Sequence, residues 1–191
     1  MLMTRRLFTS MCGSGLVAGM AGTAGAAARS SGETAYVFSF AGLNGHPIRL
    51  ANYSGKPFMV VNTASHCGFT PQLTGLEALY RQFGPKGFSI IGVPSNDFHQ
   101  EPGDAAAIAK TAEGDYHVTF PLAAKVHVIG DDAAPFYKWA AAQRPREVPQ
   151  WNFHKYLIGT DGYIAAVFPT TTVPQAPEVL AAISRQLGGA A

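Results

Sequence analysis

The chain has 191 residues, of which 47% are hydrophobic and 14% are charged. This balance suits one globular domain with a substantial core and excludes a largely disordered chain. Its formal net charge is only +2 at pH 7 and no basic stripe is visible. The composition therefore gives no indication of nucleic-acid binding.

The first 28 residues have the layout of an export signal. Arg5 and Arg6 precede an apolar run rich in Gly and Ala, and small residues follow, as in an n-region, an h-region and a cleavage site. Residues 4–8 resemble the twin-arginine signal of bacteria; an ordinary secretory signal is the alternative. The apolar run is shorter than the ~20 residues that a membrane span needs. We therefore expect a periplasmic protein with no stable membrane insertion.

Removal of residues 1–28 leaves a single thiol. The chain has two cysteines, Cys12 and Cys67, and only Cys67 lies beyond the signal. The mature protein then has no internal disulfide, and its leftover thiol is either buried and inert or reactive.

The folded domain is predicted over residues 36–191, after a flexible leader over 29–35. The dipeptide Asn44-Gly45 favours a tight turn between two short strands, 36–41 and 48–51, and so predicts an N-terminal β-hairpin.

A strand, a helix and a second strand follow. The apolar run 58–62 predicts a buried strand. Thr70 is expected to cap a helix whose first residue is Pro71, and 88–93 predicts a second buried strand. Two strands joined in this way lie parallel. Cys67 then lies at the carboxyl end of the first strand, where α/β proteins bind ligands.

The remaining pattern completes an α/β domain with a central mixed sheet flanked by helices. It predicts a helix over 104–112 capped by Asp104, a helix that follows Asp131-Asp132 and runs to about Gln143, a hairpin of 153–158 with 163–168, and a terminal helix over 177–187.

A cysteine just before a helix experiences the positive end of the helix dipole and free backbone N–H groups. Both favour the thiolate, which is the nucleophilic form. The competing interpretation is a buried Cys67 that packs as a small apolar side chain. Position alone does not choose between the two.

Three segments resemble the glutathione peroxidase family, in that family's order and spacing. They are Val61 to Gln72 around Cys67, Pro94 to Gly103, and Trp151 to Gly159. The resemblance covers roughly residues 36–187 and implies a thioredoxin-like fold. It also implies that Cys67 attacks a peroxide and becomes a sulfenic acid, while the Trp151 ring and the Asn152 amide donate hydrogen bonds to its sulfur.

One position departs from the family pattern. Asp97 stands where the family has a glutamine that donates a third hydrogen bond, and an ionised aspartate only accepts. Asp97 either turns away and leaves the sulfur with fewer donors, or stays protonated and acts as a donor or proton source. We expect the first, because a neutral carboxylic acid needs an unusually apolar site.

A second departure concerns recycling of the enzyme. Residues 104–117 lack the resolving cysteine of many relatives, and Ser95 replaces a cysteine that is common in the second segment. We therefore expect an external thiol, namely glutathione, another small thiol or a thioredoxin-like protein, to reduce the sulfenic acid.

The sequence thus predicts a monomeric, glutathione-peroxidase-like thiol peroxidase that acts on hydrogen peroxide or organic hydroperoxides, with no cofactor or metal. The alternative is a catalytically weak redox sensor or binding protein of the same fold. A disulfide oxidoreductase is disfavoured because Cys67-Gly68-Phe69-Thr70 lacks a second cysteine.

Overall fold

The computed structural model describes residues 32–188. Nearly all of them belong to one compact unit, Glu33–Ala191. The predicted export signal over residues 1–28 lies outside the described residues.

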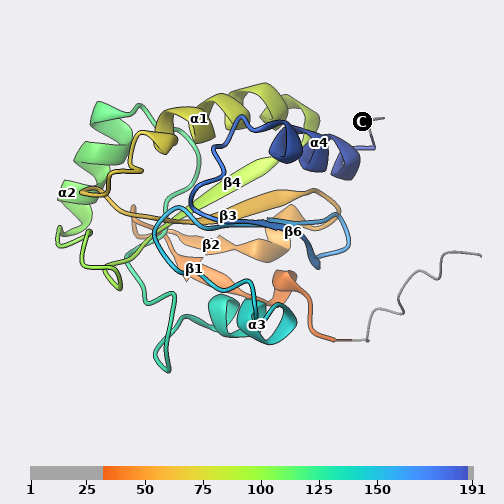
Figure 1. Ribbon diagram of the computed structural model, residues 1–191, viewed down its shortest axis with the longest axis horizontal. Helices are drawn as coiled ribbons and strands as arrows, with labels where there is room; N and C mark the ends of the chain where they lie inside the picture. The colour runs from red at the N-terminus through yellow and green to blue at the C-terminus, as the bar shows by residue number, and fades with distance from the viewer. Residues whose placement is uncertain (1–31, 189–191) are drawn as a thin grey trace, which may run out of the picture. The chain divides into compact units, whose positions relative to one another are not determined.

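A four-stranded mixed sheet forms the centre of this unit (Figure 1). Its strand order is β4-β3-β5-β6, with β3 parallel to β4 and antiparallel to β5, and β5 antiparallel to β6. The strands are β3 (Phe58–Thr63), β4 (Ser89–Pro94), β5 (Lys155–Ile158) and β6 (Ile164–Phe168). A separate N-terminal hairpin pairs β1 (Ser39–Ala41) with β2 (Pro47–Arg49). The predicted mixed sheet and N-terminal hairpin are confirmed.

Helices cover both faces of the sheet (Figure 1). Met59 and Val61 of β3 pack in a core with α1 (Gln72–Phe83) and α4 (Pro177–Gln186). Phe58 and Val60 pack on the opposite face with α3 (Pro135–Gln143). Successive side chains of a strand point to opposite faces, so the continuous apolar run of β3 supplies both cores.

Several element ends differ from the prediction. The helix expected from Asp131-Asp132 begins at Pro135, because proline suits the first helical position. The helix predicted over 104–112 consists of α2 (Ala105–Ala109), which Asp104 caps as expected, and a π-helical continuation over Lys110–Asp115. Among residues 32–188 no helix is long and apolar enough to cross a membrane.

The folded unit begins before Tyr36. The backbone N–H of the fully buried Ala35 donates to Gly162 O, and the Glu33 carbonyl accepts a hydrogen bond from the Trp139 ring. The last residues of the expected flexible leader are therefore part of the domain.

The outer edge of β4 is paired with an irregular segment, residues 121–124. Gly92 exchanges backbone hydrogen bonds with Pro121 and Ala123, and Ala124 donates to Ala41 of β1. The segment thereby covers a strand edge that would otherwise be open to pairing with another chain.

Gly92 allows this close approach, and we expect Gly92→Ala to lower the free energy of unfolding by about 1–3 kcal/mol. A Cβ at this position would lie 2.7 Å from Leu122 Cδ2 and 3.1 Å from a ring carbon of Phe120. Denaturant unfolding measures the change. Gly114→Ala is the matched control, because a Cβ there meets nothing within 4 Å. The crowding argument fails if both variants are equally stable.

Candidate active site

Cys67 lies in a tight turn between β3 and α1, as predicted. The Thr70 hydroxyl accepts a hydrogen bond from the Cys67 N–H at 3.1 Å and lies 2.8 Å from Ala64 O, to which it donates. The expectation that Thr70 caps the helix is wrong: α1 begins at Gln72, its N-cap is Pro71, and the hydroxyl turns back to the thiol loop. Thr70 thus fixes the conformation of the loop that carries Cys67.

The sulfur is buried but has a polar contact. Cys67 is 6% exposed and packs against the core between the sheet and α1. The backbone N–H of Phe69 points at its Sγ from 3.4 Å. The buried sulfur therefore has one backbone N–H donor within hydrogen-bonding distance.

Trp151 and Asn152 lie in a turn just before β5. Trp151 is 39% exposed and its ring packs against Phe98, with 5.4 Å between the centroids. Asn152 is fully buried, and its amide donates to Gln100 Oε1 at 3.0 Å. Within residues 32–188 no hydrogen bond joins either side chain to Cys67 Sγ. Their action as donors to the sulfur therefore stays a prediction.

Asp97 is directed to the segment after residue 126. Its Oδ2 accepts hydrogen bonds from Val128 N–H (2.6 Å) and Ile129 N–H (3.2 Å), and Oδ1 lies 2.6 Å from His127 Nδ1. Burial alone would raise the pKa of the Asp97 carboxyl, but the hydrogen bonds from Val128, His127 and Ile129 together hold it below its usual value. The carboxylate is thus ionised, accepts hydrogen bonds from the 127–129 segment and does not act as a donor to the sulfur. This agrees with the first alternative, in which Asp97 turns away from the thiol.

Two adjacent residues outside the predicted site connect its parts. Gln100 accepts from Asn152 through its side chain and from the His66 N–H through its carbonyl. Glu101 is 1% exposed, and its Oε2 accepts both the N–H and the hydroxyl of Ser65 at 2.8 Å. Burial raises the pKa of the Glu101 carboxyl, although the hydrogen bonds from Ser65 oppose this. Residues 100–101 therefore hold both the thiol loop and Asn152.

A cavity of about 430 Å³ adjoins Trp151. Apolar side chains form much of its wall, and Arg146, Glu147 and His154 also line it: the apolar residues are Val148, Trp151, Val167 and Pro169. The cavity thus touches one predicted site residue, Trp151.

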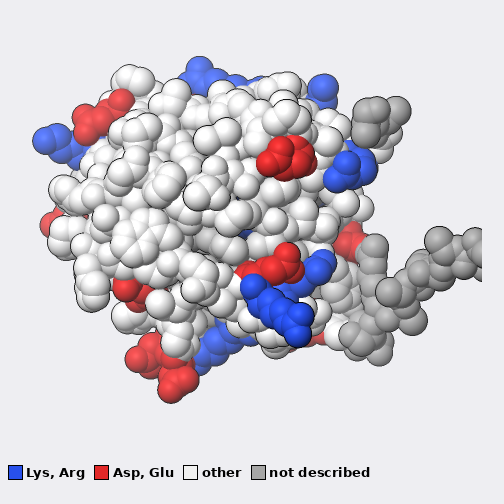
Figure 2. Space-filling view, in the orientation of Figure 1, with Lys and Arg blue, Asp and Glu red and all other residues white. Residues whose placement is uncertain are grey.

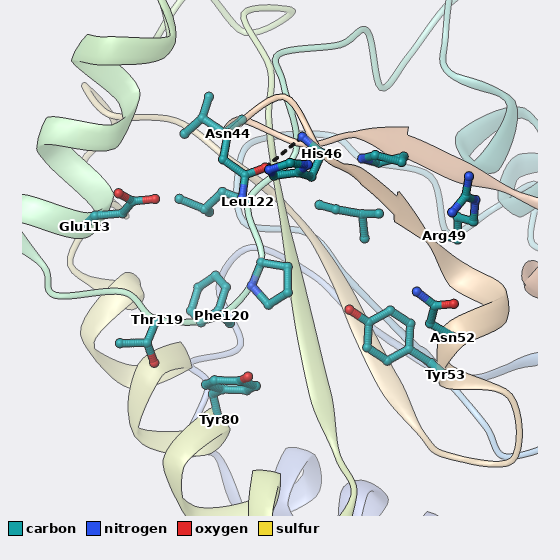
Figure 3. A pocket seen from close by; sticks show the side chains of 14 residues that line it. Asn44, His46, Arg49, Asn52, Tyr53, Tyr80, Glu113, Thr119, Phe120 and Leu122 are labelled. Carbon is teal, nitrogen blue, oxygen red and sulfur yellow. Dashed lines mark hydrogen bonds between the residues drawn. The ribbon is translucent and has the colours of Figure 1, made fainter.

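Another pocket, shown in Figure 3, lies elsewhere. Its lining includes His46 and Arg49 of the N-terminal hairpin, Glu113, Tyr80 and Phe120. None of its lining residues belongs to the predicted site. On the face shown in Figure 2 acidic and basic side chains are interspersed, and most of the surface is uncharged.

Comparison with known proteins decides the family. The profile of the family described as glutathione peroxidase matches residues 35–141. The chain belongs to the glutathione peroxidase family. Within this family it is 41% identical to the hydroperoxy fatty acid reductase gpx1 of Synechocystis, over 81% of this chain and 96% of that protein. It is 42% identical to the glutathione peroxidase-like peroxiredoxin gpx1 of Schizosaccharomyces pombe, over 69% of this chain and 86% of the other.

Solved structures agree with this assignment. The crystal structure of Trgpx in its apo form superposes with a TM-score of 0.67 at 32% identity, covering 82% of this chain and 97% of that one. A thioredoxin-family thiol:disulfide interchange protein of Chlorobium tepidum superposes with a TM-score of 0.62 at 16% identity, covering 81% and 96%. The second likeness shows the fold alone. The thioredoxin-like fold and the assignment as a glutathione-peroxidase-like thiol peroxidase are confirmed.

Lys155 has an ionisable side chain that is completely enclosed by the core. It is 0% exposed, and its Nζ donates to Phe153 O at 2.6 Å. Burial lowers the pKa of the Lys155 ammonium from 10.5 to about 7. The amine is therefore placed to hold the turn that carries Trp151 and Asn152.

We expect Asp97→Asn to lower the free energy of unfolding at pH 7 by about 1–3 kcal/mol, because an amide in place of the carboxylate leaves Val128 and Ile129 with weaker acceptors. The folded pKa of Asp97 lies below its ordinary value of 3.8, so this stability is present above pH 3.8 and is lost as the pH falls through the folded value. Denaturant unfolding at pH 7 and at pH 3 measures both effects. A difference between the two proteins that does not shrink in acid would contradict the assignment.

Lys155 predicts a pH dependence of the same sign as that of Asp97, but in the alkaline range. Between pH 7 and 10.5 the folded protein has released a proton that the unfolded chain still holds, so stability rises with pH. We expect the free energy of unfolding of the wild type, relative to Lys155→Met, to increase between pH 7 and 10 by up to about 4 kcal/mol. Subtracting the value for the Met variant removes the contributions of the other titrating groups, which both proteins share. A difference that stays constant over this range would show that burial does not lower the pKa of Lys155.

Proposed function

We propose that this chain reduces hydroperoxides through Cys67. The thiolate sulfur attacks one peroxide oxygen, the O–O bond breaks, and the other oxygen leaves with a proton as water or an alcohol. The sulfur is oxidised to a sulfenic acid and the peroxide is reduced. The observation that carries this proposal is the contact of the Phe69 N–H with Sγ in a loop fixed by Thr70.

The sulfenic acid is reduced by an external thiol. Cys67 is the one cysteine among residues 32–188, so no second described thiol is present to form an internal disulfide. A thiol RSH condenses with the sulfenic acid to a mixed disulfide and water, and a second RSH releases Cys67 and forms RSSR. Glutathione, another small thiol or a thioredoxin-like protein can supply these two electrons.

Organic hydroperoxides are the favoured substrates. The cavity beside Trp151 has an apolar wall, which suits the carbon chain of a hydroperoxide better than it suits hydrogen peroxide. One relative is named a hydroperoxy fatty acid reductase. Hydrogen peroxide is the alternative substrate, and it needs no such wall.

We place the enzyme in the bacterial periplasm as a monomer. The twin-arginine pattern at Arg5 and Arg6 supports export. The short segment over residues 144–149, before Trp151, supports a monomer, since it leaves little chain for an interface at this position.

A peroxidase assay tests the proposal. Protein beginning at Arg29 is mixed with hydrogen peroxide, cumene hydroperoxide or a hydroperoxy fatty acid, with glutathione and thioredoxin as parallel reductants. We expect consumption of peroxide, a sulfenic acid that can be trapped on Cys67, and loss of both in Cys67→Ser, because the reacting sulfur is absent.

The rate separates an enzyme from a redox sensor or binding protein. A rate constant for Cys67 oxidation close to that of a free thiol, with no turnover by either reductant, would contradict the proposal. Activity with Cys67→Ser at the level of the wild type would exclude Cys67 as the nucleophile.

A further inference from the structure

The turn that carries Trp151 and Asn152 has a strained backbone. Phe153 is 0% exposed and has a φ of 65°. A bulky side chain rarely adopts this left-handed conformation, which persists only where the surrounding structure enforces it. Some neighbouring group must therefore hold the turn in place.

Asn62 supplies most of this restraint. It is fully buried on β3, and its side-chain amide donates to Trp151 O at 3.1 Å while its Oδ1 accepts the His154 N–H at 2.9 Å. Its backbone carbonyl accepts the Phe153 N–H at 2.6 Å, and its N–H donates to His154 O. One residue thus makes four hydrogen bonds to the turn.

The side chain of Asn62 acts where the strand pairing ends. The ladder between β3 and β5 runs from Phe58 with Ile158 to Val61 with Lys155. Beyond this pair the Asn62 backbone still bonds to Phe153 and His154. The Trp151 carbonyl and the His154 N–H are paired by the Asn62 side chain instead. Lys155 Nζ adds a further hydrogen bond to the turn, which it donates to the carbonyl of Phe153.

The same strand leads directly to the thiol. From Asn62 the chain passes through Thr63 and Ala64, whose carbonyl accepts the Thr70 hydroxyl, and reaches Cys67. A displacement of the turn relative to β3 is therefore a displacement of Trp151 and Asn152 relative to the sulfur.

We propose that Asn62 is a positioning residue of the peroxidase site, which fixes Trp151 and Asn152 relative to Cys67 through its side-chain amide. The inference rests on the proposed reaction at Cys67. It assigns Asn62 no contact with the substrate: its effect on the reaction passes entirely through the turn.

Asn62→Asp tests the inference with little change of size. The variant keeps an oxygen for the His154 N–H but replaces the donor to Trp151 O with a second oxygen, which repels that carbonyl. We expect the rate constant for oxidation of Cys67 by cumene hydroperoxide to fall about 10²-fold, as for a misplacement of about 1 Å at a reacting centre. Asn52→Asp, at an exposed position of the domain, is the matched control and should react like the wild type.

Fluorescence of Trp151 reports the turn itself. The chain has two tryptophans, so in a Trp139→Phe background the emission comes from Trp151 alone. We expect Asn62→Asp to shift this emission to the red and to increase quenching by acrylamide, while far-ultraviolet circular dichroism stays that of the folded protein. A role in stability alone would leave the emission of the folded variant unchanged.

A double-mutant cycle shows whether the effect passes through the turn. In a background of Trp151→Ala with Asn152→Ala, Asn62→Asp should change the rate less than about threefold. An undiminished effect of about 10²-fold in that background would overturn the proposal, as would a folded Asn62→Asp that reacts like the wild type.

Asn62→Ser, which adds no charge, is the second variant. Slower oxidation with a folded spectrum supports the proposal even if Asn62→Asp does not fold. Failure of both variants to fold would contradict it, because Asn62 would then be needed for the fold rather than for positioning. If the wild type itself does not consume peroxide, the proposed function fails instead.

Discussion

The structure depends on the burial of one strand on both of its faces and along both of its edges. β3 pairs with β4 on one side and β5 on the other, and every one of its residues is buried. Its odd-numbered apolar side chains reach the core under α1 and α4, and its even-numbered ones reach the core over α3. Few positions of a chain are so constrained, and the thiol loop begins where this strand ends.

The carboxyl end of β3 must therefore bury polar groups, which is costly unless they are paired. Different residues form hydrogen bonds to the thiol loop and to the turn that carries Trp151. Asn62 ties the strand to the turn at Trp151. Glu101 ties a third segment to the thiol loop, and Gln100 ties that segment both to the thiol loop and to Asn152. The relative placement of the sulfur and its predicted donors thus depends on side chains other than those predicted to react.

Asp97 illustrates how this arrangement absorbs a substitution. A carboxylate beside a thiolate would raise the energy of both charges, but two backbone N–H groups and His127 offer it a more favourable site. These contacts stabilise the folded protein, but they do not replace the hydrogen bond that a glutamine at this position would donate to the sulfur. The remaining direct contact, from the Phe69 N–H, comes from the backbone and does not depend on a side chain.

Local pattern in the sequence was sufficient for the elements and for the position of Cys67. The apolar run of β3, the Asn44-Gly45 turn and the strand–helix–strand order each reflect interactions between near neighbours. Thr70 was misinterpreted because a hydroxyl before a helix can cap it or bond back to the loop, and both uses have the same local sequence.

The hydrogen-bonded framework of the site was not predictable in the same way. Glu101 reaches Ser65 across 36 positions, and Asn62 reaches His154 across 92. No periodicity records such pairs, and only the fold brings their members together. The same reason explains why the flexible leader ends earlier than predicted. Glu33 and Ala35 bond to Trp139 and Gly162, which lie far away in the sequence.

Burial of Cys67 places different demands on the two halves of the proposed cycle. A hydroperoxide group is small, so its reaction depends chiefly on how well the site stabilises charge on the sulfur. The reducing thiol must bring its own sulfur to within bonding distance of a residue that is 6% exposed. Phe69, two residues after the thiol, and Trp151 are large apolar side chains that are 36% and 39% exposed, so a reductant can contact them from solvent. With no second described cysteine to move the oxidised state to the surface, access of the reductant past these side chains becomes the constraint on recycling.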